Sequence, residues 1–525
     1  MTARAQVDVD VAVIGSGFSG SLAALALRQR GQRVALLERA RHPRFAIGES
    51  TTPLTNLLLE EFADRYDLPQ IRAFSKWGTW QRARPDVACG LKRGFTFLFH
   101  QFDEPFGDDP RHAQQLMVGA SPHDDVADTH WYRPDFDHAL VREAESAGAL
   151  YFDETRVERI RDAGAHIELS AVRAGATIPI TARFVIDAGG PRGWLTSTLG
   201  RGSAPHQWLP PTQGLYTHFR DVGLWENTAR IEGTPPYPPD AAALHHVFPG
   251  GWIWVLRFNN GITSAGAALT DELAGSIGAA DGEAAWHRLL DRLPSVRRHF
   301  AGARPTMPFI HVPRLAFRCH QVVGANWALL PSAAGVIDPL LSTGFPLTLL
   351  GLGRLLTILE ETTPGSARAA ALAEYERTTQ QELDVTEQLV AALYACMTDP
   401  PLFKRLASMY FAAASFSEAV RRLERPHVAP GFLLNAHPSF GAELRECANL
   451  VQRAPPCDDH ARRELFERID RAVQPFDTIG LLDRTRADWY PVLASDLIGS
   501  APKLQASPGE IDQLLARCGF ARIAG

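Results

Sequence analysis

The stretch most informative about the fold is Val7-Asp8-Val9-Asp10-Val11-Ala12-Val13-Ile14-Gly15-Ser16-Gly17-Phe18-Ser19-Gly20. Its apolar residues alternate and then become continuous, which is typical of the first strand of a buried parallel sheet. After the Gly-rich turn, residues 21–30 have the Ala- and Leu-rich spacing of a helix, and a second apolar strand over 34–37 ends at Glu38. The sequence therefore predicts a complete βαβ unit at residues 7–38.

Three glycines and one acidic residue in such a unit bind a dinucleotide. Gly15 permits the tight turn, Gly17 lets the backbone approach a pyrophosphate at the helix N-terminus, and Gly20 lets the helix pack closely against the strand. Glu38 can accept hydrogen bonds from both hydroxyls of an adenosine ribose. These residues indicate a dinucleotide, and by themselves they fit FAD and NAD equally.

Two later segments return to the same predicted sheet. Residues 184–190 form an apolar strand that ends in Asp187-Ala188-Gly189, and residues 327–331 form another that leads to Gly335. Strand ends that converge on one ligand indicate a cofactor longer than a mononucleotide, held by a discontinuous domain. From Pro346 onward, amphipathic spacing predicts helices over 369–396, 402–423 and 462–473.

Composition and charge narrow the function classes. The 525 residues are 45% apolar, as in a soluble globular protein, and 53 basic against 59 acidic side chains give a formal charge of −6. No basic block is present, so we expect neither nucleic acid nor a membrane surface as a partner. The six cysteines are scattered without a CxxC pair, which predicts no metal site and a reducing cytoplasm as the location. No secretory signal or membrane span is expected.

A second motif follows directly after the βαβ unit. The run His42-Pro43-Arg44-Phe45-Ala46-Ile47-Gly48-Glu49-Ser50-Thr51-Thr52-Pro53 resembles the GE[AS]TxP segment of FAD-dependent halogenases. Further resemblances follow in the family's order: Cys89 to Phe95, Arg133 with Phe136-Asp137, Asp187-Ala188-Gly189, Trp252-Ile253-Trp254, and Ile337-Asp338-Pro339-Leu340-Leu341-Ser342-Thr343-Gly344. They cover residues 7 to about 355 and are similar to the phenolic branch of the family, whose members chlorinate small electron-rich phenols such as phloroglucinol.

The resemblance implies an α/β fold with three parts. These are a doubly wound FAD-binding domain like those of glutathione reductase and p-hydroxybenzoate hydroxylase, a substrate-side β-sheet, and a C-terminal helical region. We expect one core over residues 1–355 and helices over 356–525. Within the core, the FAD module is expected in 1–60, 126–200 and 318–355, and the substrate-side sheet in 61–125 and 201–317.

The resemblance also implies a reaction. The chain would chlorinate or brominate an electron-rich, phenolic aromatic substrate, using reduced FAD, O2 and chloride or bromide through a hypohalous acid intermediate. We expect a separate flavin reductase to supply the reduced FAD, because no second strand-GxGxxG-helix unit for NAD(P)H is present. Whether the chain forms a homodimer stays open.

The same resemblance implies roles for individual residues in halide binding, in the tunnel and in FAD binding. The amides of Thr343 and Gly344 precede Pro346 at a helix N-terminus, where they could hold a halide. Trp252 and Trp254 alternate on a strand, so both indoles face one side and can form a wall between cofactor and substrate. A turn needed only for packing, and ordinary sheet packing of the indoles, are the alternatives. The tunnel motif contributes Pro339 and Ser342, and the expected FAD-binding residues are Gly15, Gly17, Gly20, Glu38, Arg44, Glu49, Ser50, Arg133, Asp187 and Gly344.

Lys92 is the expected catalytic residue. Lysine occurs only four times among 53 basic residues. Strict alternation from Lys92 would place its amine beside Gly94 and Thr96, on the face opposite Phe95. A desolvated lysine can lose its proton, whereas a guanidinium cannot, so the amine can donate to hypohalous acid or form a haloamine. The family's essential lysine falls at this motif position. The alternative is a lysine at a strand end with its amine in solvent.

Two other functions stay open on the residues alone. A flavin monooxygenase would transfer oxygen directly to the substrate without a halide step. It is favoured by Arg257, where the halogenase signature has Pro, and by Val336, where the tunnel motif has Phe. A flavoprotein that binds or senses without catalysis is the third class, and Lys92 with the paired tryptophans argues against it.

Overall fold

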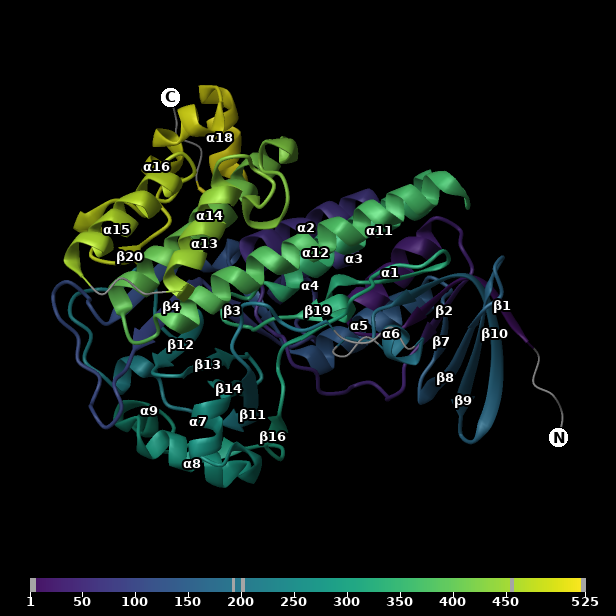
Figure 1. Cartoon of the computed structure of the whole chain (residues 1–525), viewed down its shortest axis with the longest axis horizontal. Coiled ribbons are helices and arrows are strands. Elements are labelled where there is room, and N and C mark those ends of the chain that lie inside the picture. Colours follow the sequence, from purple (N-terminus) through teal and green to yellow (C-terminus); the bar gives the residue numbers. More distant parts are fainter. Residues whose placement is uncertain (1–5, 191–193, 200–203, 454–457, 521–525) are drawn as a thin grey trace.

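Two β-sheets organise the computed structural model, which describes residues 6–190, 194–199, 204–453 and 458–520 (Figure 1). The first sheet has the strand order β7-β2-β1-β10-β9-β8, and β18 pairs with the end of β10. Strands β7, β2, β1, β10 and β18 are parallel, so their carboxyl ends meet at one edge, as the sequence predicted. The bounds are β1 Val7–Ile14, β2 Val34–Leu37, β7 Leu150–Phe152, β8 Thr155–Asp162, β9 Ile167–Arg173, β10 Ala176–Asp187 and β18 Trp327–Leu329.

Three helices begin at or near that edge: α1 (Phe18–Gln29), α5 (Arg133–Ser146) and α11 (Gly344–Glu361). Helix α1 packs against both α5 and α11. It can lie close to β1 because Gly20 has no side chain, since a Cβ there would come within 1.9 Å of the Gly15 carbonyl oxygen. The predicted βαβ unit is therefore present, and Gly20 allows the close packing of helix and strand that its position predicted.

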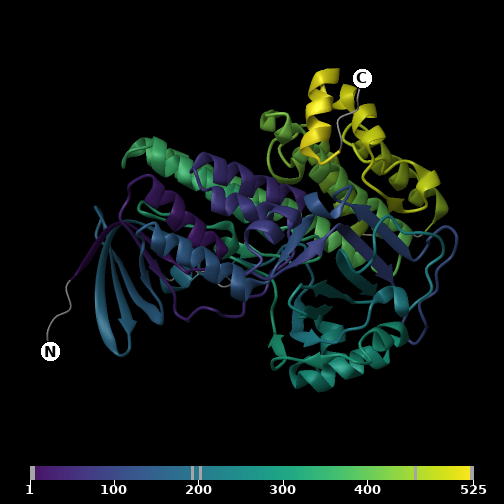
Figure 2. The ribbon, with the colours of Figure 1, turned by 180° about the vertical axis from the view of Figure 1, so that it is seen from behind.

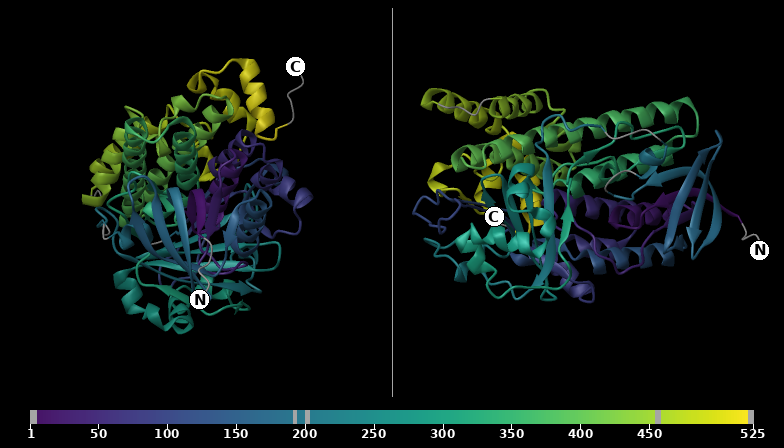
Figure 3. Two further views of the ribbon diagram at one scale, coloured as in Figure 1. Left: turned by 90° about the vertical axis from the view of Figure 1, so that its right-hand side faces the viewer. Right: turned by 60° about the horizontal axis from the view of Figure 1, so that its bottom comes forward.

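The second sheet has the order β15-β11-β14-β13-β12-β4-β5-β20, and β16 also pairs with β11. Helices α7 (Asp271–Ser276), α8 (Glu283–Asp291) and α9 (Pro294–His299) lie on one side of it, and the C-terminal helices lie on the other (Figures 1 and 3). The strands are β4 Gly94–Phe99, β5 Gln115–Gly119, β11 Thr212–Arg220, β12 Ala243–Phe248, β13 Gly251–Arg257, β14 Thr263–Thr270, β15 Arg304–Pro305, β16 Ile310–Val312 and β20 Trp489–Tyr490.

A short ribbon connects the two sheets. Strands β3 (Cys89–Lys92) and β6 (Asp128–Trp131) are antiparallel, and the register places Lys92 opposite Asp128. A second small ribbon joins β17 (Phe317–Arg318) to β19 (Gly335–Val336). The linking helices are α2 Pro53–Arg65, α3 Pro69–Arg72, α4 Trp77–Ala83, α6 Trp194–Thr198 and α10 Pro331–Ala334.

The C-terminal third is helical, as its amphipathic spacing predicted. The elements are α12 Ser366–Ala395, α13 Pro400–Arg422, α14 Phe440–Arg453, α15 Asp459–Val473, α16 Ala494–Gly499, α17 Ala501–Leu504 and α18 Pro508–Arg517. Helices α11 and α12 pack on each other and run along the molecule (Figures 1 and 2). These helices share one hydrophobic core with the first sheet, and β20 extends the second sheet. The division at residue 355 stays a prediction.

We searched the described ranges for a helix of membrane-crossing length and apolarity and found none.

Candidate active site

The turn after β1 is shaped for a phosphate group. Gly15 has φ +95°, and a Cβ there would lie 2.6 Å from the carbonyl oxygen of Ala188. Gly17 is the N-cap of α1. The guanidinium nitrogens of Arg133 and Arg44 lie 3.5 and 3.8 Å from the position that a Cβ on Gly17 would take. Helix amides and two cations therefore surround a backbone without side chains, which suits a pyrophosphate.

Glu38 ends β2 beside this turn, and its side chain is buried. It accepts hydrogen bonds from the Ser16 amide and hydroxyl (3.2 and 3.0 Å), the Ala40 amide (2.9 Å) and Arg44 Nη2 (3.0 Å). Burial by itself raises the pKa of Glu38, but the charge of Arg44 and the hydrogen bonds from Ala40 and Ser16 outweigh it, so the pKa is lowered. Glu38 is therefore ionised and can accept from ribose hydroxyls.

Arg133, the first residue of α5, holds the segment that contains Glu49. Its guanidinium forms two hydrogen bonds to Asp137 (2.7 and 2.8 Å) and donates to the carbonyls of Ile47 and Gly48. Because these groups occupy the guanidinium, Arg133 fixes the loop as well as adding charge near Gly17.

Glu49 is buried in that loop and contacts a residue far away in the chain. Its Oε1 lies 2.9 Å from His218 Nε2 on β11. Its Oε2 is buried and has no hydrogen-bond partner in the described part of the chain. Arg44 Nε is likewise buried and unpartnered within those ranges. Two orphaned polar atoms beside the phosphate turn are what a bound cofactor would satisfy, so the residues present fit FAD.

The N-termini of α1 and α11 converge at one aromatic cluster. The Phe18 and Phe345 rings lie 4.9 Å apart, and both contact Trp131. Thr343, the N-cap of α11, is buried, while Gly344 is exposed and a Cβ there would meet no described atom within 4 Å. The amides expected to hold a halide thus border open space near the phosphate turn.

Other predicted cofactor and tunnel residues have structural contacts. Both carboxylate oxygens of Asp187 accept from backbone amides, of Gly189 (2.8 Å) and Leu195 (2.9 Å), so Asp187 positions the turn after β10. Ser342 is buried with φ +53°, and its amide donates to the carbonyl of Pro339, which is exposed.

The two tryptophans of β13 lie on one face, with ring centroids 5.7 Å apart. Trp252 Nε1 donates to the Tyr394 hydroxyl (3.2 Å), which in turn donates to Asp338 Oδ2 (2.8 Å). Burial raises the pKa of Asp338 to about 7, although the hydrogen bonds of Tyr394, Leu340 and Trp252 oppose it. Trp254 Nε1 donates to Ser264 (3.2 Å).

Arg257 lies on the opposite face of β13. It contacts Asp240 at 2.7 Å and donates to the carbonyls of Val222 and Gly223. It is therefore remote from the tryptophan wall, and the feature that favoured a monooxygenase is part of the packing behind the sheet.

Lys92 is fully buried between the two sheets. Its Nζ donates to Ser50 Oγ (2.9 Å) and to the Thr51 carbonyl (2.5 Å), and it lies 3.8 Å from the centroid of the Phe95 ring. Burial lowers the pKa of the Lys92 ammonium, and the charge of Asp128 opposes this in part. Ser50, expected at the flavin, is thus a direct partner of the lysine.

The expected environment of Lys92 was wrong in one respect. The alternation does not run from Lys92 into β4, because the chain changes sheet at Arg93, whose amide donates to the Ala241 carbonyl. Lys92 ends β3 and Gly94 begins β4, so the amine lies against Phe95, the residue expected on the opposite face.

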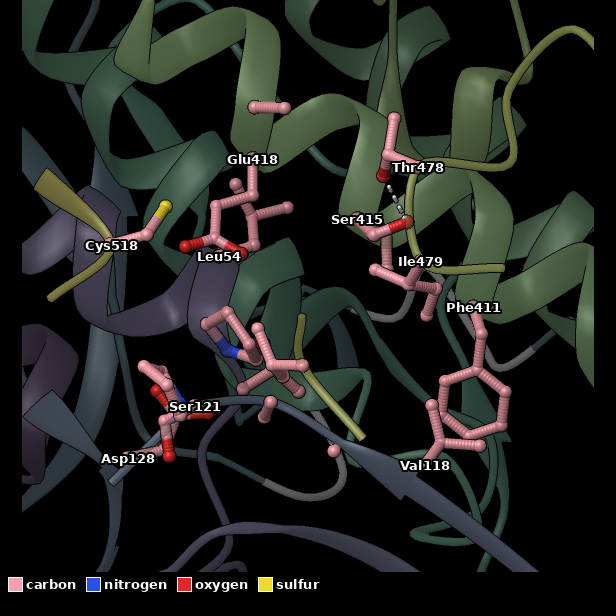
Figure 4. A pocket seen from close by; sticks show the side chains of 18 of the residues that line it. Leu54, Val118, Ser121, Asp128, Phe411, Ser415, Glu418, Thr478, Ile479 and Cys518 are labelled. Carbon is pink, nitrogen blue, oxygen red and sulfur yellow. Dashed lines mark hydrogen bonds between the residues drawn. The ribbon is translucent and has the colours of Figure 1, made fainter. Parts of the chain in front are cut away.

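A pocket of about 90 Å³ lies next to residues that neighbour Lys92 (Figure 4). Phe95 and Asp128, both neighbours of Lys92, line it. It extends between the segment after Thr51, strand β5 and helix α13, and further lining residues are Pro53, Leu54, Val118, Ser121, Tyr410, Phe411, Ser415, Glu418, Thr478 and Ile479. The pocket combines aromatic walls with a few polar groups, as sites for small ligands do.

Sequence reasoning missed several of these residues. Asp128 and His130 lie on β6 near Lys92, His218 pairs with Glu49, and Tyr394 comes from α12. None stands in a motif, and residues 128–131, Asp-Thr-His-Trp, show no polar and apolar alternation that would mark a strand. In the described ranges no group of three His, Cys, Asp or Glu side chains could hold a metal ion.

Comparison with known proteins agrees with this geometry. The family described as "FAD dependent oxidoreductase" matches residues 10–334. The chain is 30% identical over 397 residues to the monodechloroaminopyrrolnitrin halogenase PrnC of Pseudomonas fluorescens, covering 74% of this chain and 68% of that protein. It is 31% identical over 424 residues to the tetracycline 7-halogenase of Kitasatospora aureofaciens, covering 77% and 73%.

Solved structures give the same result. The crystal structure of halogenase PltM in complex with phloroglucinol and FAD superposes with a TM-score of 0.79 at 25% identity, covering 91% of this chain and 99% of that one. The predicted α/β fold, the FAD cofactor and the halide are thereby confirmed. The chain belongs to the family of FAD-dependent halogenases and is an enzyme that halogenates an aromatic substrate.

Proposed function

We propose that this halogenase acts on a small phenolic substrate and that Lys92 is the residue that handles the hypohalous acid. The position of Lys92 carries the proposal. Its buried amine is held by Ser50 and Thr51 on the cofactor side and contacts Phe95, which lines the pocket. An amine so placed meets an electrophile that travels from cofactor to pocket, and its lowered pKa favours proton exchange.

The cofactor residues have separate tasks in this proposal. Bound FAD, in its reduced form, supplies the electrons that let O2 oxidise the halide. Gly17 with Arg44 and Arg133 would hold the pyrophosphate, Gly15 and Gly20 would shape the turn around it, and Glu38 would hold the ribose. Asp187 keeps the turn beside Gly15 in place. Glu49, Ser50 and Gly344 face the flavin ring.

The segment before α11 binds the halide and lines the tunnel. The amides of Thr343 and Gly344 point out of a helix N-terminus, which stabilises an anion. The open space at Gly344 and the convergence with Phe18 support a halide site next to the cofactor. Pro339 and Ser342 shape the backbone leading to it, and Trp252 and Trp254 close the space between cofactor and substrate.

A phenol is supported by the pocket and by one relative. Halogenase PltM binds phloroglucinol in a crystal structure. The pocket here offers aromatic side chains to a ring and hydroxyl and carboxyl groups to its substituents. A separate reductase supplies the reduced FAD, because the sequence holds a single dinucleotide-binding unit.

One assay tests the proposal. The purified protein is given reduced FAD, O2 and bromide with a panel of phenols and indoles, and products are read by mass spectrometry. We expect the bromine isotope pattern on phenols in preference to indoles. Hydroxylated products without bromine would instead favour a monooxygenase. Rapid reduction of bound FAD by NADPH without a partner protein would contradict the separate reductase.

A further inference from the structure

Asp128 is a buried carboxyl group with one oxygen unused. It begins β6, directly opposite Lys92, and is 5% exposed. Its Oδ1 accepts a hydrogen bond of 2.7 Å from Asn56 Nδ2 on α2. Its Oδ2 is buried and has no hydrogen-bond partner among the residues that the structure describes. Native proteins rarely leave such an oxygen unsatisfied, so a ligand group is expected there.

Lys92 does not satisfy this carboxylate. The amine donates to Ser50 and to the Thr51 carbonyl, and no ion pair joins it to Asp128 in the described ranges. The other charged groups near the pocket have partners of their own. Lys76 lies 3.6 Å from Glu60, and Arg422 donates to Glu418 at 2.8 Å. Asp128 is therefore a carboxylate that the protein holds in place without neutralising it by a direct contact.

The unused oxygen belongs to a residue that lines the pocket beside Phe95 (Figure 4). Ser121 lines the same pocket, and its hydroxyl is also buried with no partner in the described part of the chain. Phe95, Tyr410 and Phe411 supply aromatic surface. Two orphaned oxygens and aromatic walls in one pocket match a flat ring that carries a hydroxyl group.

We propose that Asp128 binds the phenolic hydroxyl of the substrate through Oδ2 and accepts its proton during halogen transfer, with Ser121 as a second hydrogen-bonding partner. This inference rests on the proposed function, since it presumes a phenolic substrate and an electrophile delivered beside Lys92. It makes Asp128 a catalytic residue and the basis of preference for rings with a free hydroxyl.

The chemistry balances with the hypohalous acid HOX as oxidant. A ring carbon gives its electron pair to X, and the O–X bond breaks with its pair going to oxygen. The hydroxyl proton passes to Asp128 as the oxygen pushes electron density into the ring. The proton on the halogenated carbon then leaves and combines with the released hydroxide, and Asp128 returns its proton to the phenolic oxygen. The sum is phenol plus HOX giving halophenol plus water.

The position of Asp128 suits this exchange. Burial raises the pKa of Asp128, and the charge of Lys92 opposes the rise. A carboxylate with a raised pKa is a stronger base at neutral pH than a solvated one. The hydrogen bond from Asn56 occupies Oδ1, so Oδ2 is the oxygen left to accept from a substrate.

The test compares D128N with the wild type in the FAD-loaded enzyme. Phloroglucinol is the probe, with bromide, O2 and reduced FAD, and a dye in solution captures free hypobromite. Asparagine keeps the shape and the contact with Asn56 but is no base. We expect bromination of phloroglucinol to fall about 100-fold and its Kd to rise about 10- to 100-fold. Captured hypobromite should rise by the amount of product lost, with O2 consumption unchanged.

Matched variants separate a catalytic role from a structural one. D240N removes another carboxylate, behind the second sheet with its side chain 7% exposed, and should leave the bromination rate per bound FAD unchanged. S121A should raise the Kd for phloroglucinol about fivefold, which tests the proposal even where D128N does not fold.

Three results would overturn the inference. These are bromination by D128N within about threefold of the wild type, an unchanged Kd in S121A, or a collapse of O2 consumption in D128N. Failure of the wild type to brominate any phenol would instead contradict the proposed function. Failure of the proposed function and failure of the role of Asp128 are therefore distinguishable.

Discussion

Two neighbouring histidines on β12 face opposite sides of the second sheet, and their surroundings differ. His245 packs on Phe97 and Trp252, on the side of Lys92 and the C-terminal helices. His246 points to the other side, where His100 and His299 meet it. Both histidines are fully buried, and burial lowers the pKa of both. The difference lies in how the polar groups around them are satisfied.

The far side is a closed network. His246 Nδ1 lies 3.0 Å from His100 Nε2, and its Nε2 lies 3.3 Å from His299 Nδ1. The chain of contacts continues from His299 to Asp240 and Arg257. Each ring nitrogen of His246 has a partner, so this network needs no ligand and stabilises the packing of β12 against α9.

The near side is an open network. His130 Nδ1, Asp128 Oδ2 and Ser121 Oγ are all buried without a partner in the described ranges. They lie around Lys92 or along the pocket. Burial alone therefore does not identify an active site in this protein. The near side differs because its unpartnered polar groups line or adjoin a pocket, where a ligand can supply the missing hydrogen bonds.

The largest expected effect comes from the lysine on the open side. Lys92→Met keeps the buried chain length and removes the amine, so FAD binding and O2 consumption should persist while halogenation falls about 100-fold or more. Product is measured by mass spectrometry with bromide. Lys404→Met is the matched control, since Lys404 is also buried but bonds only to His112, Ala113 and Asp488. It should lose stability and keep activity. Undiminished halogenation by Lys92→Met would rule out Lys92.

The next largest effect is a loss of folding stability at acid pH, caused by the buried histidines of the closed network. Burial lowers the pKa of His100 from 6.5 to about 3, so the folded state keeps the ring neutral while the unfolded state binds a proton below pH 6.5. Stability is therefore full above that pH and is lost as the pH falls toward the folded pKa. From about pH 7.5 to about pH 5 the loss is about 2 kcal/mol per buried histidine.

Urea unfolding at both pH values checks this expectation. His246→Gln removes one titrating ring and should reduce the acid loss by about 2 kcal/mol. His460→Gln, at an exposed site on α15, should not change it. An acid loss equal in His246→Gln and wild type would contradict a neutral buried ring.

A smaller effect is expected for Arg257. Arg257→Met removes the guanidinium partner of Asp240 and leaves that carboxylate with His299 and the Trp225 amide, which should cost about 2 kcal/mol, less than for a fully buried pair because Arg257 is partly exposed. Halogenation per bound FAD should not change, because Arg257 lies behind the sheet. Thermal unfolding and bromination measure the two quantities. Loss of bromination at full FAD content would place Arg257 in the reaction.

The smallest effect on halogenation is expected for Trp252, one of the two tryptophans that separate cofactor and substrate. Trp252→Phe keeps an aromatic ring but removes the hydrogen bond to Tyr394, which should cost about 1 kcal/mol and lower the halogenation rate a few-fold. Trp225→Phe, on the closed side, is the control and should leave the rate unchanged. Equal rates in both variants would show that the indole nitrogen of Trp252 has no role.

The dinucleotide-binding βαβ unit and the family could be predicted without the structure. Turn glycines and strand periodicity act within a few residues, so residues 7–38 were readable without a structure. The parallel return of β10 and β18 followed from the same patterns. The sequence also singled out Lys92 as a candidate, because arginine replaces lysine almost everywhere else in this chain, and its catalytic role stays a prediction.

The surroundings of Lys92 depend on contacts between distant parts of the chain and became visible in the tertiary structure. Its neighbour Asp128 depends on the register of β3 and β6, and the pair of Glu49 and His218 joins residues 169 positions apart. Local alternation put Lys92 on the wrong face, because Arg93 leaves one sheet for another and resets the pattern. Contacts between distant strands follow from chain topology, and no short-range rule in the sequence encodes them.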